Sequence, residues 1–233
     1  MAVVQMQHWW FVARRQILAA IIKKLSLPNS ADILEIGCGT GGNLAMLAAF
    51  GRLCAMETDD SARKCANALN ICSVAIGELP NTVPYDDATF DLICLFDVLE
   101  HIKDDVIALE RVKRLLKPGG RLLITVPAYA WLWSAHDESH HHKRRYTAAT
   151  LKRRAIHAGL TVMRIGYFNT LIFPVIATIR LIRLRTTSVS DAKIPQAPIN
   201  TMLKMLFALE RFVVPFVFFP FGTSVIAVLE HSK

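Results

Sequence analysis

The chain has 233 residues and a formal net charge of +8, with 27 Lys and Arg against 19 Asp and Glu. This length suits one large α/β domain, or a domain of about 150 residues with a substantial appendage. No uncharged stretch reaches the roughly 20 residues that a membrane-spanning helix requires, and five cysteines without a CxxC pair indicate core thiols in a reducing cytoplasm.

Hydrophobic residues make up 53% of the chain, and their excess lies mainly in the C-terminal third. This is more than the interior of a typical domain needs, so we expect apolar surface that meets a membrane or a partner. The positive charge favours anionic partners, either nucleic acid or acidic lipid headgroups. Charge alone does not choose between them.

The first segment, residues 1–30, is predicted to be an amphipathic helical lead-in. Apolar residues recur at helical spacing from Trp10 through Ala13, Ile17 and Ile21. No continuous apolar region with a small-residue cleavage site is present in residues 1–24, so no signal peptide is predicted.

Residues 31–36 form a short apolar run that leads into a glycine cluster and predicts a buried strand. Four further β-like runs follow, at residues 52–57, 71–76, 90–96 and 121–126. Helical segments lie between most of them, and the best defined, residues 103–116, is stopped by the Lys-Pro-Gly-Gly sequence at 117–120. Strands that alternate with helices predict a doubly wound, mostly parallel sheet with helices on both faces.

A predicted helix at residues 148–158 leads to a sixth strand at 160–168, and residues 223–229 read as a seventh. The residues between these two strands are far more than a simple strand pair needs. The core is therefore expected over residues 31–168, a hydrophobic helical insertion over 169–221, and the last strand with the C-terminus over 222–233.

The glycine cluster reads Glu35-Ile36-Gly37-Cys38-Gly39-Thr40-Gly41-Gly42. Glycines after a strand permit a tight turn and a close approach of backbone to a ligand, so a nucleotide-like cofactor is expected here. The segment also satisfies GxGxxG through Gly37, Gly39 and Gly42, which leaves a NAD-binding fold as an alternative.

Further motifs follow in a set order. An acid, Glu57, closes the second strand, and the later motifs are Gly77-Glu78-Leu79-Pro80, Phe90-Asp91-Leu92-Ile93, Asp97-Val98-Leu99-Glu100-His101 and Lys117-Pro118-Gly119-Gly120. With the glycine cluster they make residues 32–127 resemble the class I S-adenosylmethionine (SAM) dependent methyltransferases. A NAD enzyme is not expected to share both the Val-Leu-Glu-His run and the Lys-Pro-Gly-Gly turn.

The resemblance implies a Rossmann-like fold, SAM as cofactor and S-adenosylhomocysteine as product. It assigns the methionine part of SAM to Glu35, Gly37, Cys38, Gly39, Thr40 and Gly41. It assigns the ribose to Glu57 with Thr58 beside it, the border of the adenine to Gly77, Glu78 and Leu79, and the floor of the site to Asp97 and Val98. The alternative is purely structural: a tight strand-to-helix turn, with Asp97 or Glu100 capping the next helix.

Residues 127–146 join aromatic surface to titratable groups. They resemble a subset of the family that pairs a His-Asp step, here His136-Asp137, with a downstream His-x-Arg-Arg-Tyr. Imidazole titrates near neutral pH, so His101 and His136 are the candidate catalytic bases. The candidate acceptor-binding residues are Tyr129, Trp133, His142, Arg144, Arg145 and Tyr146.

Arg144 and Arg145 are suited to grip a phosphate or carboxylate. The alternative is that they form ordinary ion pairs and that Tyr146 packs on the sheet. No metal site is predicted. Adjacent histidines at 140–142 cannot all point the same way in an extended segment, and methyl transfer does not require a metal.

The insertion contains an apolar run at residues 171–184, interrupted by Thr178, Arg180 and Arg183 and followed by Arg185. A second run at 203–221 carries a cluster of phenylalanines. Such segments suit an anionic membrane interface. A lid over the active site and a dimer interface are the alternatives.

The sequence therefore predicts a SAM-dependent methyltransferase acting on a lipid-like or lipid-linked acceptor, of a glycan or quinone pathway for example, at the cytoplasmic face of a membrane. The alternatives are a soluble small-molecule O- or N-methyltransferase and a non-catalytic SAM-binding module. Nucleic acid is not expected as the substrate, because the fourth strand carries neither an Asn/Asp-Pro-Pro-aromatic motif nor a Pro-Cys nucleophile. The sequence does not predict the oligomeric state.

Overall fold

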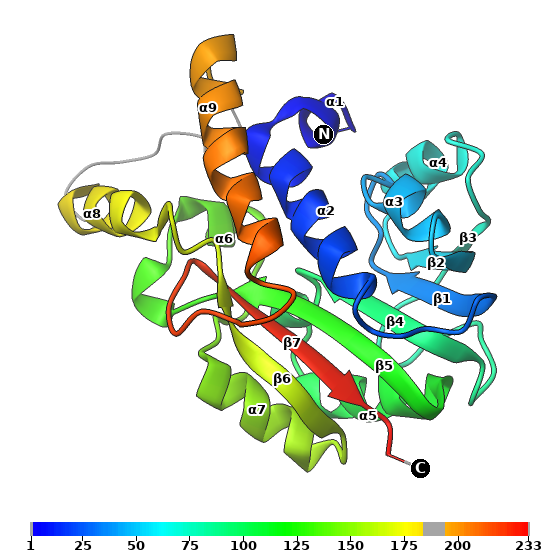
Figure 1. Ribbon diagram of the computed structural model, residues 1–233. Coiled ribbons are helices and arrows are strands. Elements are labelled where there is room, and N and C mark those ends of the chain that lie inside the picture. Colours follow the sequence, from blue (N-terminus) through cyan, green and yellow to red (C-terminus); the bar gives the residue numbers. More distant parts are fainter. Residues whose placement is uncertain (1, 184–193, 233) are drawn as a thin grey trace.

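The computed structural model describes residues 2–183 and 194–232, which fold around one seven-stranded sheet (Figure 1). From edge to edge the strands are β3 (Val74–Ile76), β2 (Gly51–Glu57), β1 (Ala31–Ile36), β4 (Phe90–Phe96), β5 (Leu116–Pro127), β7 (Ser224–Glu230) and β6 (Thr161–Phe168). The pairs from β3 to β5 are parallel, whereas β7 runs antiparallel to both of its neighbours. The predicted mostly parallel, doubly wound Rossmann-like sheet is confirmed.

Helices cover both faces of the sheet (Figure 1). On one face α2 (Trp9–Ile22) packs beside α9 (Ala197–Ala208), and on the other α5 (Asp105–Leu115) packs beside α7 (Ala148–His157). The remaining described helices are α1 (Ala2–Gln7), α3 (Leu44–Ala48), α4 (Asp60–Asn67), α6 (Ala135–Ser139) and α8 (Phe173–Arg183), with the 3-10 turns η1 (Leu99–His101), η2 (Ala130–Leu132) and η3 (Leu209–Phe212).

Because helices lie on both faces, the central strands are apolar along nearly their whole length. One buried cluster joins the sheet to α5 and α7, through Leu109 and Leu151 for example. A second joins it to α2 and α9, through Ile17 and Phe207. The insertion thus contributes to the core as well as to the surface.

Most predicted boundaries lie within one or two residues of those in the structure, and the starts of the third and fifth strands differ by more. The third strand begins at Val74 rather than at residue 71, because the Asn67 side chain hydrogen-bonds to the backbone of Val74 and ends α4 against it. Residues 117–120 are not a separate turn. They form the irregular start of β5, where the register against β4 shifts between Phe90 and Leu92.

The predicted hydrophobic helical insertion is present as α8, α9 and η3; in the upper part of Figure 1, α9 extends upward and α8 lies to its left. Buried Glu210 anchors it to the end of β6, since its carboxylate accepts hydrogen bonds from the amides of Asn169, Thr170 and Leu171 at 2.5, 2.6 and 3.0 Å. The end of the predicted apolar run, Leu184 and Arg185, lies outside the described residues. Among the described helices, none has both the length and the apolar character needed to cross a membrane.

Candidate active site

The glycine loop after β1 folds back on the end of β2. The amides of Gly37 and Cys38 donate to the Met56 carbonyl at 2.8 and 3.3 Å. Gly37 has φ +71°, and a Cβ there would lie 2.6 Å from Cγ2 of Val98. Glycine is therefore required at this position both by backbone conformation and by the approach of Val98.

Glu57 ties this loop to the start of α4. Its carboxylate accepts hydrogen bonds from the amides of Gly39 at 2.7 Å, Thr58 at 2.8 Å and Asp59 at 2.9 Å. A carboxylate has about four acceptor positions, so these bonds leave capacity for a further donor. This geometry suits the ribose hydroxyls that the resemblance assigns to Glu57.

A cavity of about 370 Å³ opens beside the ends of β1, β2 and β4. Its volume lies in the range of about 300–1,000 Å³ that is usual for small-molecule sites. It brings together six residues that were predicted from the sequence, Thr58, Gly77, Glu78, Leu79, Val98 and His101. The other lining residues are Ile36, Met56, Pro80, Asn81, Ile102, Lys103, Asp104 and Lys143.

Glu35 lies fully buried beneath the loop. Asn43 donates to its Oε1 at 2.8 Å, whereas Oε2 has no hydrogen-bond partner among the described residues. Burial raises the pKa of Glu35 to about 8, and the charges of Arg14 and Glu57 act on it in opposite directions. A buried carboxylate with a spare oxygen beneath the loop fits a cofactor whose methionine part carries an ammonium group.

Asp97, predicted to lie on the floor of the site, is held by two neighbours. Arg14 reaches from α2 to place Nη2 2.8 Å from Oδ2 of Asp97, and the Thr125 hydroxyl lies 3.2 Å from Oδ1. Arg14, which is only 5% exposed, was not predicted from the sequence as a site residue. A signal existed, because Arg14, Leu18 and Ile21 fall at helical spacing on one stripe of α2.

Helix α1 covers the outer side of the glycine loop. The Thr40 hydroxyl donates to Oε1 of Gln5 at 2.8 Å, and a Cβ on Gly42 would lie 2.6 Å from the same oxygen. Gly41, at φ +86°, instead packs against Leu69 and the core. The structure thus places Thr40 toward α1, a contact that the sequence did not predict.

On the acceptor side, Tyr129 follows β5 and lies at the centre of an aromatic cluster. Its ring centroid lies 5.2 Å from that of Tyr167 and 5.8 Å from that of Trp131. Phe173 of α8 contacts Tyr129 and Trp131 and reaches Phe221 near the end of the insertion. Trp131, Phe173 and Phe221 were not predicted as site residues.

Arg144, Arg145 and Tyr146 are all engaged by protein carboxylates. Arg145 makes two hydrogen bonds to Asp137, from Nε at 2.8 Å and from Nη2 at 2.9 Å. Arg144 Nη1 lies 2.9 Å from Oδ2 of Asp105, and the buried Tyr146 hydroxyl donates to the same carboxyl oxygen at 2.9 Å. This arrangement is the ion-pairing alternative that the sequence left open.

The two candidate bases lie in different places. His101 lines the cavity, and desolvation together with the neighbouring His142 lowers its pKa to about 4. His136 lies on α6, where its ring centroid is 4.1 Å from that of His140 and 6.0 Å from that of His142. Trp133 is half-exposed beside the same segment.

The sequence of residues 7–165 matches the family model of a methyltransferase domain. The chain belongs to this family. Both the predicted class, the class I SAM-dependent methyltransferases, and the predicted cofactor, SAM, are confirmed.

Two curated proteins and one solved structure are similar to this methyltransferase. The sterol 4-C-methyltransferase strm-1 of Caenorhabditis elegans is 28% identical over 48% of this chain and 36% of its own length. The "Probable S-adenosylmethionine-dependent methyltransferase Rv3030" of Mycobacterium tuberculosis is 24% identical over 71% of this chain and 61% of its own length. Phosphoethanolamine N-methyltransferase 2 of Haemonchus contortus, solved with SAM, has a TM-score of 0.63 at 18% identity, with 94% of this chain and 52% of that one covered.

This chain spans between 35% and 61% of the length of the first curated relatives that it matches. The structural likeness, at 18% identity, shows the fold alone. The family is therefore established for the core, whereas the acceptor has to be argued from this chain's own surface.

Proposed function

We propose that this chain transfers a methyl group from SAM to a lipid-like or lipid-linked acceptor at a membrane surface. The observation that carries the proposal is that many large apolar side chains of the insertion are exposed. Other apolar side chains of the same helices are buried in the core. The exposed large apolar residues of the insertion, among those that the structure describes, are Leu171, Val175, Ile194, Ile199, Met202, Met205, Leu206, Leu209, Phe212, Val213, Phe216, Val217 and Phe221. Exposed apolar side chains in this number on one segment favour an interaction surface.

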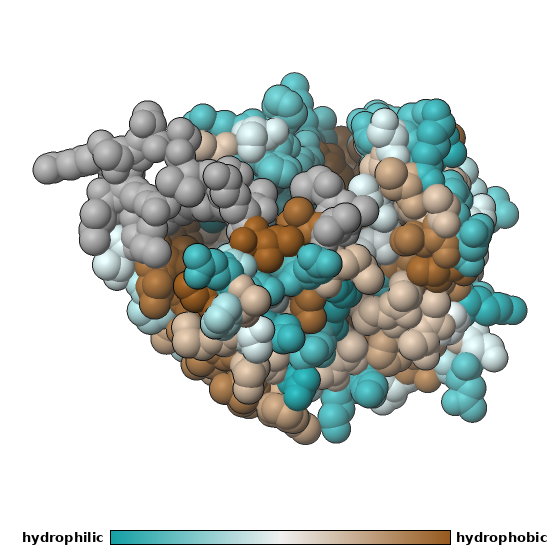
Figure 2. Space-filling model, turned by 90° about the horizontal axis from the view of Figure 1, so that it is seen from above, coloured by the Kyte–Doolittle hydropathy of each residue, from teal (hydrophilic) through white to brown (hydrophobic). Residues whose placement is uncertain are grey.

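Figure 2 looks onto the end of the molecule from which α8 and α9 project and shows hydrophobic patches interrupted by hydrophilic ones. Basic side chains lie directly on the aromatic rings of the insertion. Lys24 lies 4.7 Å from the ring centroid of Phe216, and Arg211 lies 4.7 Å from that of Phe212. Aromatic rings flanked by cations suit the boundary between acyl chains and anionic headgroups.

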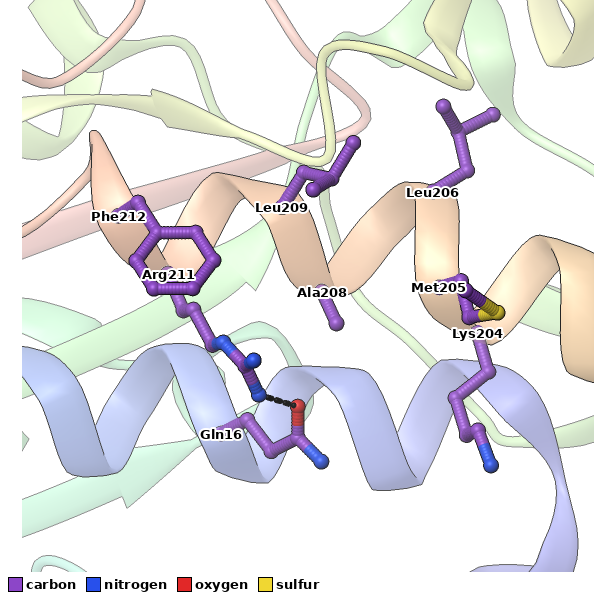
Figure 3. A pocket seen from close by; sticks show the side chains of 8 residues that line it. All are labelled: Gln16, Lys204, Met205, Leu206, Ala208, Leu209, Arg211 and Phe212. Atoms are coloured by element: carbon purple, nitrogen blue, oxygen red, sulfur yellow. Dashed lines mark hydrogen bonds between the residues drawn. The ribbon is translucent and has the colours of Figure 1, made fainter.

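The surface between α2 and the insertion is hollowed into an open cavity of about 490 Å³ (Figure 3). Leu206, Leu209 and Phe212 line it from α9 and η3, and Arg211 donates to the side chain of Gln16 across it at 2.7 Å. The hollow therefore offers apolar walls with a polar edge, as a lipid-like molecule requires.

The insertion also meets the acceptor side of the core. Phe173 of α8 contacts Tyr129 and Trp131 at the end of β5, and Phe221 contacts Phe173. Aromatic contacts thus run from the insertion to the edge of the sheet where the resemblance expects the methyl acceptor. This continuity favours an apolar acceptor over a small polar one.

Bound SAM supplies a methyl group attached to a positively charged sulfur. The acceptor attacks the methyl carbon in line with the carbon-sulfur bond, and the sulfur is the leaving group. The protein's part is to hold and align: Glu57 is positioned for the ribose and Val98 shapes the wall of the cavity, while the Tyr129 cluster excludes water on the acceptor side. Positioning is therefore proposed as the main source of catalysis.

The membrane part of the proposal is tested by flotation with vesicles of anionic phospholipid at low salt. We expect the wild type to float and the double variant Phe212→Glu/Phe216→Glu to stay in solution. The matched control is Ile107→Glu/Met163→Glu, two exposed apolar residues on α5 and β6 that lie outside the insertion. If the wild type does not float, the membrane proposal fails and the soluble alternative with a lid replaces it.

Methyl transfer is tested separately with labelled SAM and detergent-solubilised membrane lipids. Label in the lipid fraction supports the proposed acceptor class, whereas label only in small polar molecules supports the soluble alternative. SAM binding with no transfer to any fraction contradicts the enzyme and supports a binding module.

A further inference from the structure

Three metal-ligating side chains meet at the border of the cofactor cavity. Glu100 and His101 lie on η1, directly after β4, and His142 lies on the loop after α6. The three offer ligand atoms that lie within 4.8 Å of one another. The amide of Lys143 donates to the Glu100 carbonyl at 2.7 Å, which fixes the second loop against the first.

Glu100 is the unusual member of this cluster. It is fully buried, and neither carboxyl oxygen has a hydrogen-bond partner among the residues that the structure describes. A buried carboxyl group without donors is costly unless a charge or a metal compensates it. Such a group, aimed at two imidazoles, points to a cationic ligand.

His142 is oriented as a metal ligand would be. Its Nδ1 lies 2.9 Å from Oδ1 of Asp137, a buried carboxylate that Arg145 holds in place. A ring whose Nδ1–H is donated to a carboxylate presents the lone pair of Nε2 on its other side. This carboxylate-histidine pair is the usual support of a metal-bound imidazole.

We propose that Glu100, His101 and His142 bind a divalent transition-metal ion of the zinc type. Two imidazoles and one carboxylate form the donor set of many zinc and non-haem iron sites. Ligand bonds of about 2.0–2.2 Å bring donor atoms to within roughly 3–4 Å of one another, so side-chain rotations close the cluster. The sequence groups the histidines of one segment, whereas the fold combines His142 with residues that follow β4.

The place of the site suggests its use, and this step rests on the proposed function. His101 lines the cofactor cavity, so the ion would lie at the border of that cavity and would coordinate an acceptor oxygen that reaches it. A coordinated hydroxyl has a lowered pKa and releases its proton to solvent. Its oxygen then bonds to the methyl carbon, and the electron pair of the broken carbon-sulfur bond stays on sulfur.

The test measures metal binding alone, on tag-free full-length protein stripped with a chelator. Zn²⁺ is titrated by calorimetry and Co²⁺ by its visible absorption, without SAM or acceptor. We expect one ion per wild-type chain, and affinities reduced at least about tenfold in His101→Ala and Glu100→Gln. The control His157→Ala, an exposed histidine at the end of α7, should bind as the wild type does.

A thermal melt accompanies each titration, because Zn²⁺ bound to the folded state must raise the Tm of the wild type and of His157→Ala. No Co²⁺ absorption and no Zn²⁺ heat with the folded wild type overturn the proposal. Binding that is unchanged in both ligand variants also overturns it. Either failure leaves the methyltransferase proposal standing, since that is judged by methyl transfer.

Discussion

Glu57 holds the glycine loop against the start of α4, and the family resemblance also assigns it to the ribose of the cofactor. It accepts hydrogen bonds from three amides, and a carboxylate has capacity for a further donor. We predict that Glu57→Ala weakens SAM and S-adenosylhomocysteine binding by about 10- to 100-fold, the equivalent of one hydrogen bond to a charged group. Calorimetry on the wild type and the variant measures this change.

The matched control for this prediction is Asp60→Ala, which removes a carboxylate only three residues away. Asp60 is exposed and pairs with Arg63 and Lys64 on the surface of α4. Its variant should bind SAM as the wild type does. Equal affinity of Glu57→Ala and the wild type would contradict the placement of the ribose.

Glu35 makes stability depend on pH. Burial raises its folded-state pKa to about 8 from an ordinary 4.5, so between these values the folded state holds a proton that the unfolded state has lost. Unfolding then releases a proton, and the contribution of Glu35 to stability falls as the pH rises from about 5 to 8. In the variant Glu35→Gln, we predict that the free energy of unfolding decreases by roughly 2–4 kcal/mol less between about pH 5 and 8 than it does in the wild type. Urea unfolding across that pH range measures the difference.

Site residues were predicted correctly where a local sequence motif identifies them. They were missed where the side chain that contacts them lies far away in the sequence. The strand ends and the glycine loop placed Thr58, Gly77 and Val98 at one cavity. The partner of Asp97 was missed because Arg14 belongs to the lead-in helix, distant in sequence. In the same way, nothing local in the Val-Leu-Glu-His run indicates that His142 lies beside Glu100.

Among the elements, the insertion depends on one buried carboxylate. Glu210 accepts hydrogen bonds from three consecutive amides after β6, although burial raises its pKa. We predict that Glu210→Ala lowers the free energy of unfolding by about 2–4 kcal/mol, because it leaves buried amides without an acceptor. Chemical denaturation measures this, with Glu110→Ala on the exposed side of α5 as control. A loss below 1 kcal/mol would show that the anchor is dispensable.

The strands were predicted well because hydrophobic runs and glycines are local signals. The start of β5 at Leu116 was not predicted. Lys-Pro-Gly-Gly is a sequence that usually stops a helix, and here it also forms the irregular first residues of a strand. Pairing of the Gly119 and Gly120 backbone with His231, near the far end of the chain, stabilises that course. Only the tertiary fold reveals such a contact.

At the scale of the whole molecule, the insertion is connected to the glycine loop through α1. The Asn200 side chain of α9 accepts from the Trp9 amide at 2.9 Å and donates to the Gln7 carbonyl at 3.0 Å, which bridges the break between α1 and α2. Gln5 of α1 in turn contacts Thr40. The surface proposed to dock on lipid and the loop proposed to hold the cofactor are therefore joined through α1.

This link predicts that Asn200→Ala loosens residues 2–8 while the sheet keeps its stability. Loss of two hydrogen bonds of about 0.5–1 kcal/mol each makes local opening easier by roughly five- to thirtyfold, and amide hydrogen exchange in α1 should quicken accordingly. The control Asn81→Ala alters an exposed side chain near the cavity and should leave exchange in α1 unchanged. Unaltered exchange in the Asn200 variant would mean that α1 is held by the Gln5 contacts alone, and that docking of the insertion does not reach the cofactor loop by this route.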